Sequence, residues 1–317
     1  MDMAEKTASA FLGFAVGDAL GTPVEKETRE TLALNPVTGM IGHQRRNQPP
    51  GTWSDNSSLV FCTCESLCNG YDLEDIAIQY SNWKNNRFWT PYRRVFTIDI
   101  QIEKAIERID RFIEMGIRIR PYPAEGVSEK QNGNGSLMRI LPLAFFLRTS
   151  APEERFKIIG EVSSLTHPHI RAVTGCYLYA EFARLLLTTD DKGKAYEELH
   201  SGVRRFLSGK MDPKELQHYS RILDHYIGGF PESTIETTQY VVHSLEAALW
   251  SVMRGNSFRE TVLLAVNLGG DTDTIGALAG GLAGLIYGSN QIPEEWLSVI
   301  ARKEDIIDLA GRFAQSL

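Results

Sequence analysis

Residues 241–252 read Val-Val-His-Ser-Leu-Glu-Ala-Ala-Leu-Trp-Ser-Val, and this stretch decides the fold class. Val241, Leu245, Leu249 and Val252 recur at the spacing of one face of an α-helix. Similar apolar stripes run through residues 8–20, 59–67, 98–112, 170–187, 197–207 and 258–268. No stretch of comparable length alternates with the period of two that a half-buried strand requires. The sequence therefore predicts an all-α fold.

The connections between these helices are predicted to lie in a few segments. They are concentrated at residues 27–50, 121–135, 207–213 and 228–233. The length of 317 residues suits either one large helical domain or two smaller ones. Because no connection has the composition of a long Gly/Ser-rich or Pro-rich linker, we predict a single domain over residues 1–317.

Composition and charge exclude several classes of protein. Hydrophobic residues make up 43% of the chain and charged residues 23%, which is typical of a globular protein and not of a disordered one. The formal net charge of −7 argues against nonspecific nucleic-acid binding. The most apolar stretch, residues 275–287, is shorter than a membrane-spanning helix and is interrupted by glycine. We expect no association with a membrane.

The cysteines and the N-terminal residues indicate a cytoplasmic protein. Cys62, Cys64 and Cys68 lie too close together to join distant parts of the chain, and Cys176 is the fourth cysteine. We expect all four to be reduced, with the first three as small core residues on one helix. The first residues lack the basic and apolar regions of an export signal.

A row of glycines predicts a close helix contact. Gly276, Gly280, Gly284 and Gly288 recur at intervals of four residues, so they would share one face of a helix that follows Asp273. Each internal glycine costs about 0.5–1 kcal/mol relative to alanine, which implies that something approaches this face closely. Another helix of the core is the expected neighbour.

Two acidic motifs lie just before predicted helices. The first, residues 51–58, reads GTWSDNSS, and the second, residues 269–274, reads GGDTDT. Taken singly, each motif is explained by helix capping, since Ser, Thr, Asp and Asn accept hydrogen bonds from free backbone N–H groups. Taken together, they offer the carboxylate, amide and hydroxyl oxygens that Mg²⁺ and Mn²⁺ prefer. Both interpretations stay open at the level of the residues.

Three further segments carry polar residues at the ends of helices. Residues 13–25, GFAVGDALGTPVE, form a predicted helix that leaves Glu25 beyond its end. Residues 132–139, NGNGSLMR, form a loop whose backbone N–H groups could bind a phosphate or could be a simple turn. His167 and His169 flank Pro168, a pattern more typical of a turn and helix start than of a metal site.

These segments, in this order, resemble the ADP-ribosylglycohydrolase family. The GGDTDT motif with its glycine-rich helix is the most specific part of the resemblance, and the NGNGSLMR loop comes next. The resemblance implies a single compact all-α domain with a cleft that holds two divalent cations, Mg²⁺ or Mn²⁺. It also implies hydrolysis of the glycosidic bond that joins ADP-ribose to an acceptor.

The resemblance assigns roles to individual residues. Glu25 and Asp55 would be catalytic. The predicted metal ligands are Ser54, Asp55, Asn56, Asp271, Asp273 and Thr274. The residues predicted to line the ADP-ribose pocket are Asn134, Gly135, Ser136, Met138 and His167. The expected partners are ADP-ribose and an ADP-ribosylated protein or other acceptor, bound by a monomer.

One residue departs from the family pattern. Asn56 stands where the family usually has a second aspartate, so an amide oxygen replaces a carboxylate. The loss of one negative charge should weaken one of the metal positions. Three interpretations follow: an enzyme with a weakened metal position, a non-catalytic or weakly active ADP-ribose-binding module, or a residue changed to trap a ligand. We favour the enzyme because the other expected site residues are present.

Overall fold

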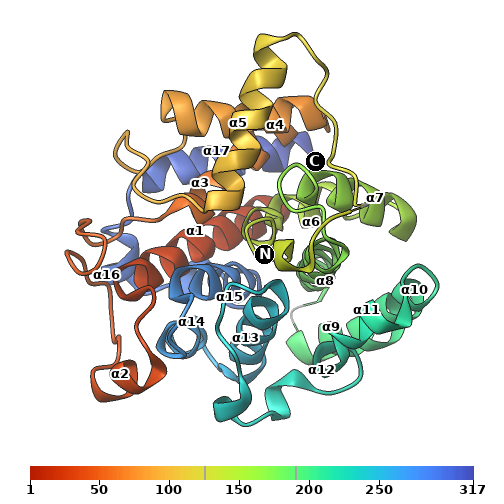
Figure 1. Cartoon of the computed structure of the whole chain (residues 1–317). Coiled ribbons are helices and arrows are strands. Elements are labelled where there is room, and N and C mark those ends of the chain that lie inside the picture. The colour runs from red at the N-terminus through yellow and green to blue at the C-terminus, as the bar shows by residue number, and fades with distance from the viewer. Residues whose placement is uncertain (125, 190) are drawn as a thin grey trace.

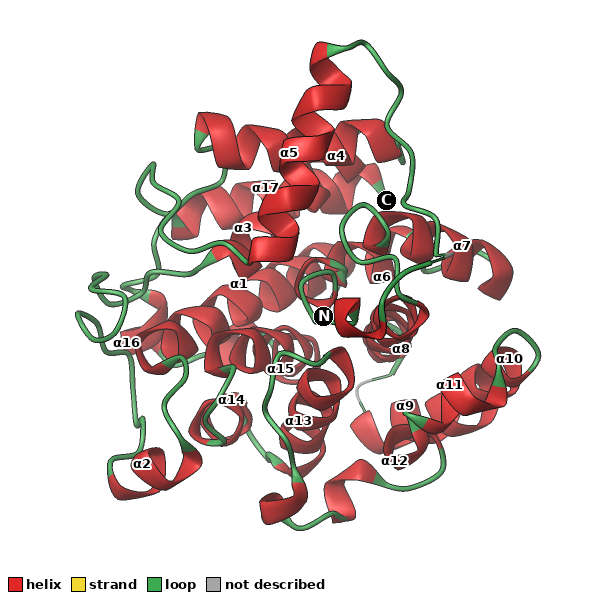
Figure 2. Ribbon diagram, viewed as in Figure 1, coloured by secondary structure: helices red, strands yellow, loops and turns green. Residues whose placement is uncertain are grey.

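The computed structural model describes residues 1–124, 126–189 and 191–317 and is built from helices (Figure 2). Across these residues, β-pairing is limited to an isolated bridge between Gly133 and Tyr240. The predicted all-α fold is therefore confirmed. None of the described helices combines the length and the apolar character that a bilayer crossing requires.

The helices follow one another along the chain, with longer connections at residues 35–54, between α2 and α3, and at residues 87–99, between α4 and α5. The α-helices are α1 (Met3–Gly21), α2 (Arg29–Leu34), α3 (Asp55–Leu67), α4 (Leu73–Asn86), α5 (Ile100–Glu114), α6 (Leu141–Phe146), α7 (Pro152–Ser163), α8 (Ile170–Leu186), α9 (Lys192–Glu198), α10 (Arg204–Ser208), α11 (Pro213–Gln217), α12 (Ser220–Leu223), α13 (Val241–Arg254), α14 (Phe258–Asn267), α15 (Thr272–Tyr287), α16 (Glu294–Leu297) and α17 (Lys303–Ser316). Short 3₁₀ turns include η1 (Thr22–Val24), η2 (Glu129–Gln131) and η3 (Leu137–Arg139), and a π-helical turn, η4 (Leu199–Val203), joins α9 to α10.

The centre of the fold is the antiparallel contact between α1 and α15 (Figure 1). Gly13 faces Gly280 and Gly17 faces Gly276, and a β-carbon added at Gly276 would lie 2.5 Å from the carbonyl oxygen of Gly17. Gly284 packs against Ser9 in the same way. The predicted glycine face is confirmed for these three positions of α15. Gly288 instead lies just beyond the helix, where its φ of 83° ends α15.

The other helices pack around this pair and share one core. Helices α13 and α14 contact α15, and α17 contacts α1 (Figure 1). Helix α3 packs against α4, which in turn packs against α5. The buried apolar residues form a single cluster that runs from Ala10 in α1 to Phe313 in α17. The chain is thus one compact domain.

The expected helices appear with shifted ends. The stripe at 98–112 becomes α5, which begins at Ile100 because the Asp99 carboxylate accepts hydrogen bonds from the backbone N–H groups of Gln101 and Ile102. The stripe at 197–207 spans the end of α9, the π-helical turn and α10. The predicted connection at 27–50 was wrong in part, since it contains α2. Helices α4, α7 and α17 were not predicted.

The cysteines are free thiols, as expected. Cys62, Cys64 and Cys176 are buried, and Cys68 is half-buried at the end of α3. Burial raises the pKa of the Cys62 and Cys64 thiols, so both stay protonated.

Candidate functional site

A polar cavity of about 260 Å³ lies where α3, α15 and the start of α5 meet the loop before η3. Both acidic motifs line it, although Asn56 and Thr274 are 218 residues apart in the sequence. The predicted site residues that line the cavity are Glu25, Asp55, Asn56, Asn134, Gly135, Met138, Asp271, Asp273 and Thr274. Ser54, Ser136 and His167 are not among the lining residues.

The first acidic motif is held by a buried carboxylate of α1. Ser54 is the N-cap of α3, and its hydroxyl oxygen accepts a hydrogen bond from the Asn56 backbone N–H. Asp18 Oδ2 accepts hydrogen bonds from the backbone N–H groups of Ser54 and Ser57, at 2.9 and 3.0 Å, and from Ser57 Oγ at 2.6 Å. The Asp18 carboxylate thereby fixes the start of α3, and with it the direction in which Asp55 and Asn56 enter the cavity.

The second acidic motif begins with a glycine turn. Gly269 and Gly270 have φ values of 75° and 74°, and a β-carbon at Gly270 would lie 2.5 Å from Thr237 Oγ1. Only glycine adopts this backbone shape without strain and fits so close to the neighbouring loop. The Asp271 side chain makes no capping hydrogen bond to α15. Helix capping thus accounts for Ser54 but not for Asp271.

Asp271 instead connects the acidic motif to the glycine loop. Its Oδ2 atom accepts a hydrogen bond of 2.5 Å from Asn134 Nδ2, which also donates to Ser244 Oγ at 2.7 Å. The loop backbone is fixed by hydrogen bonds from Asn134 N to Gln239 O and from Val241 N to Asn132 O. The loop for which a phosphate contact was predicted therefore orients a carboxylate.

The carboxylates of the cavity are buried close to one another. Burial, followed by the negative charge of Asp18, raises the pKa of Asp55 to about 7. Burial also raises the pKa of Asp271 to about 6, although the Asn134 hydrogen bond acts in the opposite direction. The pKa of Asp273 is raised by burial and by Asp271. A cation among these groups would relieve their mutual repulsion.

Asn56 faces the second motif across the cavity. Its Oδ1 atom accepts a hydrogen bond from Thr274 Oγ1 at 3.4 Å. Its Nδ2 atom is buried and has no hydrogen-bond partner among the described residues. An unpaired buried amide costs free energy, so the position is under-satisfied by the protein alone.

The donor set fits a hard divalent cation. Among the described residues, no three acidic, histidine or cysteine side chains converge into a ready metal site. The two acidic motifs bring three carboxylates, one amide and one hydroxyl to the cavity: Asp55, Asp271, Asp273, Asn56 and Thr274. Glu25 and Asp99 add two further carboxylates to its lining. Mg²⁺ commonly binds through a few such oxygens and completes its coordination shell with water.

Glu25 lines the cavity, is buried and forms an ion pair. Its carboxylate accepts a hydrogen bond of 2.7 Å from Arg46 Nε, and Lys26 Nζ is 3.6 Å from Oε1. Glu25 follows η1 as predicted, beyond the end of α1. Arg46 comes from the loop between α2 and α3, so that loop covers one side of the site.

Ser136 and His167 lie behind the glycine loop. Ser136 Oγ accepts a hydrogen bond of 2.9 Å from Ser163 Oγ, and His167 Nδ1 is 2.6 Å from Thr166 Oγ1. A β-carbon added at Gly135 would come within 2.7 Å of the His167 ring. Burial, followed by the charge of Arg139, lowers the pKa of His167 to about 3, so the imidazole is neutral. In this structure both side chains support the loop from below.

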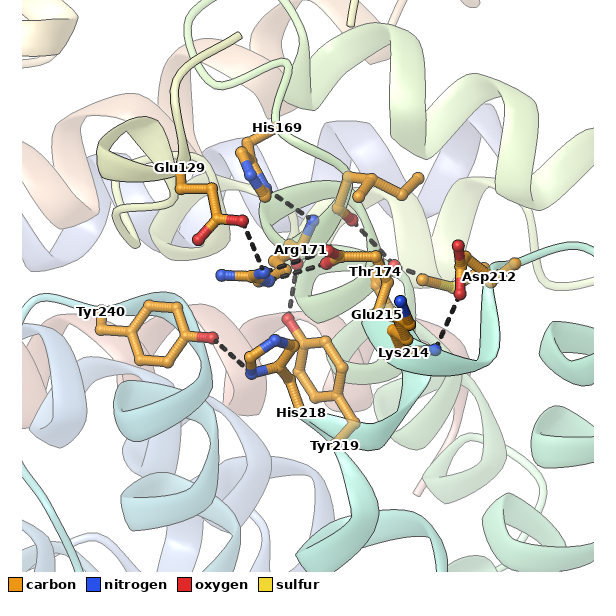
Figure 3. A network of polar contacts seen from close by, with 12 residues as sticks. Glu129, His169, Arg171, Thr174, Asp212, Lys214, Glu215, His218, Tyr219 and Tyr240 are labelled. Atoms are coloured by element: carbon orange, nitrogen blue, oxygen red, sulfur yellow. Dashed lines mark hydrogen bonds and ion pairs between the residues drawn. The ribbon is translucent and has the colours of Figure 1, made fainter.

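A network of ion pairs fixes the outer side of the same loop (Figure 3). Arg171 binds Glu215 through Nε at 2.7 Å and lies 3.7 Å from Glu129 (Figure 3). His169 caps α8, its Nδ1 atom accepting a hydrogen bond from the Arg171 backbone N–H. The predicted helix start at His169 is thus confirmed. Tyr240, which pairs with Gly133, extends the network to His218.

Several residues of the site were not predicted from the sequence. Asp18, Arg46, Asp99 and Gln239 either line the cavity or position its walls. Asp18 did carry a signal, because an aspartate inside the apolar stripe at 8–20 must be buried and therefore needs hydrogen-bond donors. Arg46 and Gln239 lie in irregular segments, where no periodic pattern identifies the side chains that turn inward.

Known proteins share both the sequence and the fold. The sequence model of the family described as ADP-ribosylglycohydrolase matches residues 1–317. An ADP-ribosylarginine hydrolase Tri1 of Pseudomonas putida is 30% identical over 96% of this chain and 77% of its own length. The ADP-ribosyl-[dinitrogen reductase] glycohydrolase of Rhodospirillum rubrum is 27% identical over 94% of this chain and 91% of its own length.

The comparison of folds agrees with that of sequences. A solved ADP-ribosylglycohydrolase-related protein complex superposes with a TM-score of 0.79 at 30% identity, covering 99% of both chains. Because these relatives are named as hydrolases, the comparisons give no support to the alternative of a non-catalytic binding module. The family match over the whole chain, on a fold that brings both acidic motifs into one cavity, shows that this protein belongs to the ADP-ribosylglycohydrolase family and is a hydrolytic enzyme.

Proposed function

We propose that this enzyme releases ADP-ribose from an ADP-ribosylated arginine side chain of a protein. The observation that carries the proposal is the meeting of Asp55 and Asn56 with Asp271 and Asp273 in one cavity, next to the Asn134 loop. The choice of arginine rests on the relative that is named an ADP-ribosylarginine hydrolase. We further propose that residues 1–317 act as one domain, as a monomer and in the cytoplasm, which the free cysteines support.

We assign the cation sites to oxygens of the two motifs. Asp55, Asn56, Asp271, Asp273 and Thr274 would hold two divalent cations, Mg²⁺ or Mn²⁺. Such cations, when bound, position the ribose hydroxyl groups and lower the pKa of a coordinated water. Ser54 could join as a ligand only if its hydroxyl exchanged its capping hydrogen bond for a metal contact.

The protein groups would do the remaining work of the reaction. Cleavage breaks the bond between the anomeric carbon and the acceptor nitrogen, water supplies the new oxygen, and the departing nitrogen takes up a proton. Glu25 and Asp55 both line the cavity and are the carboxylates proposed to move that proton. The Asn134–Gly135 loop would orient the nucleotide, with Met138 as an apolar wall.

Release of ADP-ribose tests the proposal directly. Purified enzyme should liberate ADP-ribose, measured by chromatography, from ADP-ribosyl-arginine in the presence of Mg²⁺ or Mn²⁺, and a chelator should abolish release. We expect Asp271→Asn to reduce kcat/KM by about 100-fold or more. Asp308→Asn, a change of the same kind at a side chain that is 69% exposed on α17, should leave the rate unchanged. The absence of release from arginine, serine and nucleic-acid conjugates at high enzyme concentration would contradict the proposal.

A further inference from the structure

Two hollows lie along α5 next to the cavity of the candidate site. The first, of about 580 Å³, shares Ile100 with the catalytic cavity and runs between α5 and the loop that follows it. The second, of about 440 Å³, shares Tyr122 and Pro123 with the first and extends to Phe112 near the end of α5. The two hollows, taken together, are here called the α5 groove; they lie side by side along α5, and the first borders the candidate site at Ile100.

The α5 groove is lined by basic side chains. Lys104 lines the first hollow, and Arg108, Arg118 and Arg120 line the second. None of the described residues that line either hollow is acidic. Lys104, Arg118 and Arg120 are exposed and form no ion pair within the described chain. This concentration of positive charge contrasts with the net charge of −7 of the whole protein.

Arg108 adds a charge that the protein leaves uncompensated. Its Nη2 atom donates to the Leu165 carbonyl oxygen at 3.0 Å, and its guanidinium carbon lies 2.8 Å from the centre of the Tyr122 ring. Its Nη1 atom is buried without a hydrogen-bond partner among the described residues. An anion in the groove would compensate this charge, since no carboxylate of the described chain does so.

The spacing along α5 indicates an extended ligand. Ile100, Lys104, Arg108 and Phe112 recur every four residues, so they share one face of the helix. At a rise of 1.5 Å per residue this face is about 18 Å long, which matches an extended peptide of about five residues. Apolar groups such as Phe112, Ile117 and Pro121 alternate with the basic ones and would contact the side chains of such a peptide.

We propose that the α5 groove binds an acidic, extended segment of the acceptor protein beside the ADP-ribosylated side chain. This inference rests on the proposed function, because it assumes that the acceptor is a protein. A peptide is favoured over a nucleic acid because the apolar walls suit side chains and the net negative charge of the enzyme disfavours a long polyanion.

The test compares three substrates at several salt concentrations. They are ADP-ribosyl-arginine alone, an ADP-ribosylated peptide flanked by Glu and Asp, and the same peptide with Ser and Gln in their place. We expect the wild-type enzyme to have a KM on the order of tenfold lower for the acidic peptide than for the neutral one, and the difference to shrink with salt. The double variant Lys104→Glu, Arg120→Glu should lose this preference while keeping kcat for ADP-ribosyl-arginine.

A matched control separates local from overall charge. The variant Arg205→Glu, Lys210→Glu makes the same change in net charge at exposed positions in and after α10, away from α5 (Figure 1). It should retain the wild-type preference. Circular dichroism would verify that both double variants are folded.

Several outcomes would overturn the inference. They are equal KM values for the two peptides in the wild type, and an unchanged preference in the Lys104→Glu, Arg120→Glu variant. A raised KM for ADP-ribosyl-arginine in that variant would show that the groove holds the nucleotide instead. Competition by a single-stranded oligonucleotide but not by an unmodified acidic peptide would assign it to nucleic acid. If ADP-ribosyl-arginine itself is not hydrolysed, the proposed function fails, and fluorescence anisotropy with the unmodified acidic peptide still tests the groove.

Discussion

The side-chain amide of Asn56 has only part of its hydrogen-bonding capacity satisfied by the protein. Its amide oxygen faces Thr274 across the cavity, while its amide nitrogen is buried without a partner among the described residues. An aspartate at this position would add another buried carboxylate to those of Asp55, Asp271 and Asp273. It would accept hydrogen bonds or bind a cation with both oxygens. The asparagine therefore lowers the repulsion within the metal-free protein; if it faces a cation as proposed, it does so at the expense of cation affinity.

Asn56→Asp should strengthen cation binding. We expect the dissociation constant for Mn²⁺, measured by calorimetry, to fall on the order of tenfold, since one more negative charge faces the cation. The metal-free variant should have a lower melting temperature than the wild type at pH 8, where the added carboxylate repels its neighbours.

Asn69→Asp is the matched control for this change. Asn69 is exposed just beyond the opposite end of α3, so its replacement should alter neither quantity. An unchanged or weakened Mn²⁺ affinity in Asn56→Asp would show that residue 56 does not face a cation.

The local sequence was sufficient to identify the candidate residues, but not to predict that the two acidic motifs line the same cavity. The Asp55 and Asp271 motifs were visible as polar residues before helices, yet capping explained each of them equally well when taken alone. What joins them is a contact between distant parts of the chain, which the family resemblance supplied and helical periodicity does not. His167 differs from these residues. It was predicted to line the ADP-ribose pocket, but in the structure its ring packs against Gly135 of the glycine loop.

The contact between α1 and α15 depends on glycine at both helices. The spacing of Gly276, Gly280 and Gly284 was sufficient to predict a close neighbour, because it repeats within one helix. The neighbour itself could have been found, since Gly13 and Gly17 carry the same spacing on α1. Helix α2 could not be predicted, because six residues are too few for a period of 3.6 to show.

Other helices were missed although their pattern was present. In α17, Ile306, Leu309 and Phe313 recur on one face, and all three are buried. The stripe is narrow and is surrounded by charged residues, so it stands out less than the broad stripe of α13. Amphipathic helices at the surface of a bundle are harder to detect for this reason.

Gly276→Ala should destabilise the protein by about 2–3 kcal/mol. The added β-carbon would lie 2.5 Å from the Gly17 carbonyl oxygen, and two helix backbones cannot separate without loss of packing along the whole contact. The measurement is the free energy of unfolding in urea.

Gly311→Ala provides the opposite case on a helix without such a contact. Gly311 lies in α17, where an added β-carbon meets nothing within 4 Å. This substitution should stabilise the protein by about 0.5–1 kcal/mol, because alanine is the better helix former. Equal effects of the two substitutions would contradict the role assigned to the α1–α15 contact.

The cavity of the candidate site brings together residues from the first and last quarters of the chain. Asp55 lies in the first quarter of the chain and Asp271 in the last, and the cavity between them contains few groups that neutralise their charge. Ligand binding in this cavity therefore links segments that unfolding would separate. Any cation held there stabilises the entire fold by mass action.

Divalent cations should raise the melting temperature more at high pH than at low pH. The folded-state pKa of Asp55 is about 7 and that of Asp271 about 6, both raised above the values of an unfolded chain. In the metal-free protein, their contribution to stability is therefore fully present below about pH 4 and is lost as the pH rises to 7. Cations compete with these protons, so they bind best once the carboxylates are ionised.

Calorimetric scans with Mg²⁺ or Mn²⁺ and with a chelator check this expectation. We expect a gain on the order of 5 °C at pH 8 and a much smaller gain at pH 5.5. Asp308→Asn should show the wild-type gain, and Asp271→Asn should show little. The same gain at both pH values would argue against carboxylate ligands.

The close contact of α1 with α15 also bears on the synthesis of the protein. Gly17 and Gly276 are separated by most of the length of the chain. At 5–20 residues per second, translation of the segment between them takes roughly 10–50 s. Until then the nascent α1 has a bare backbone face with no partner, and half of the catalytic pocket does not exist. We expect the enzyme to acquire its activity only after α15 has been synthesised.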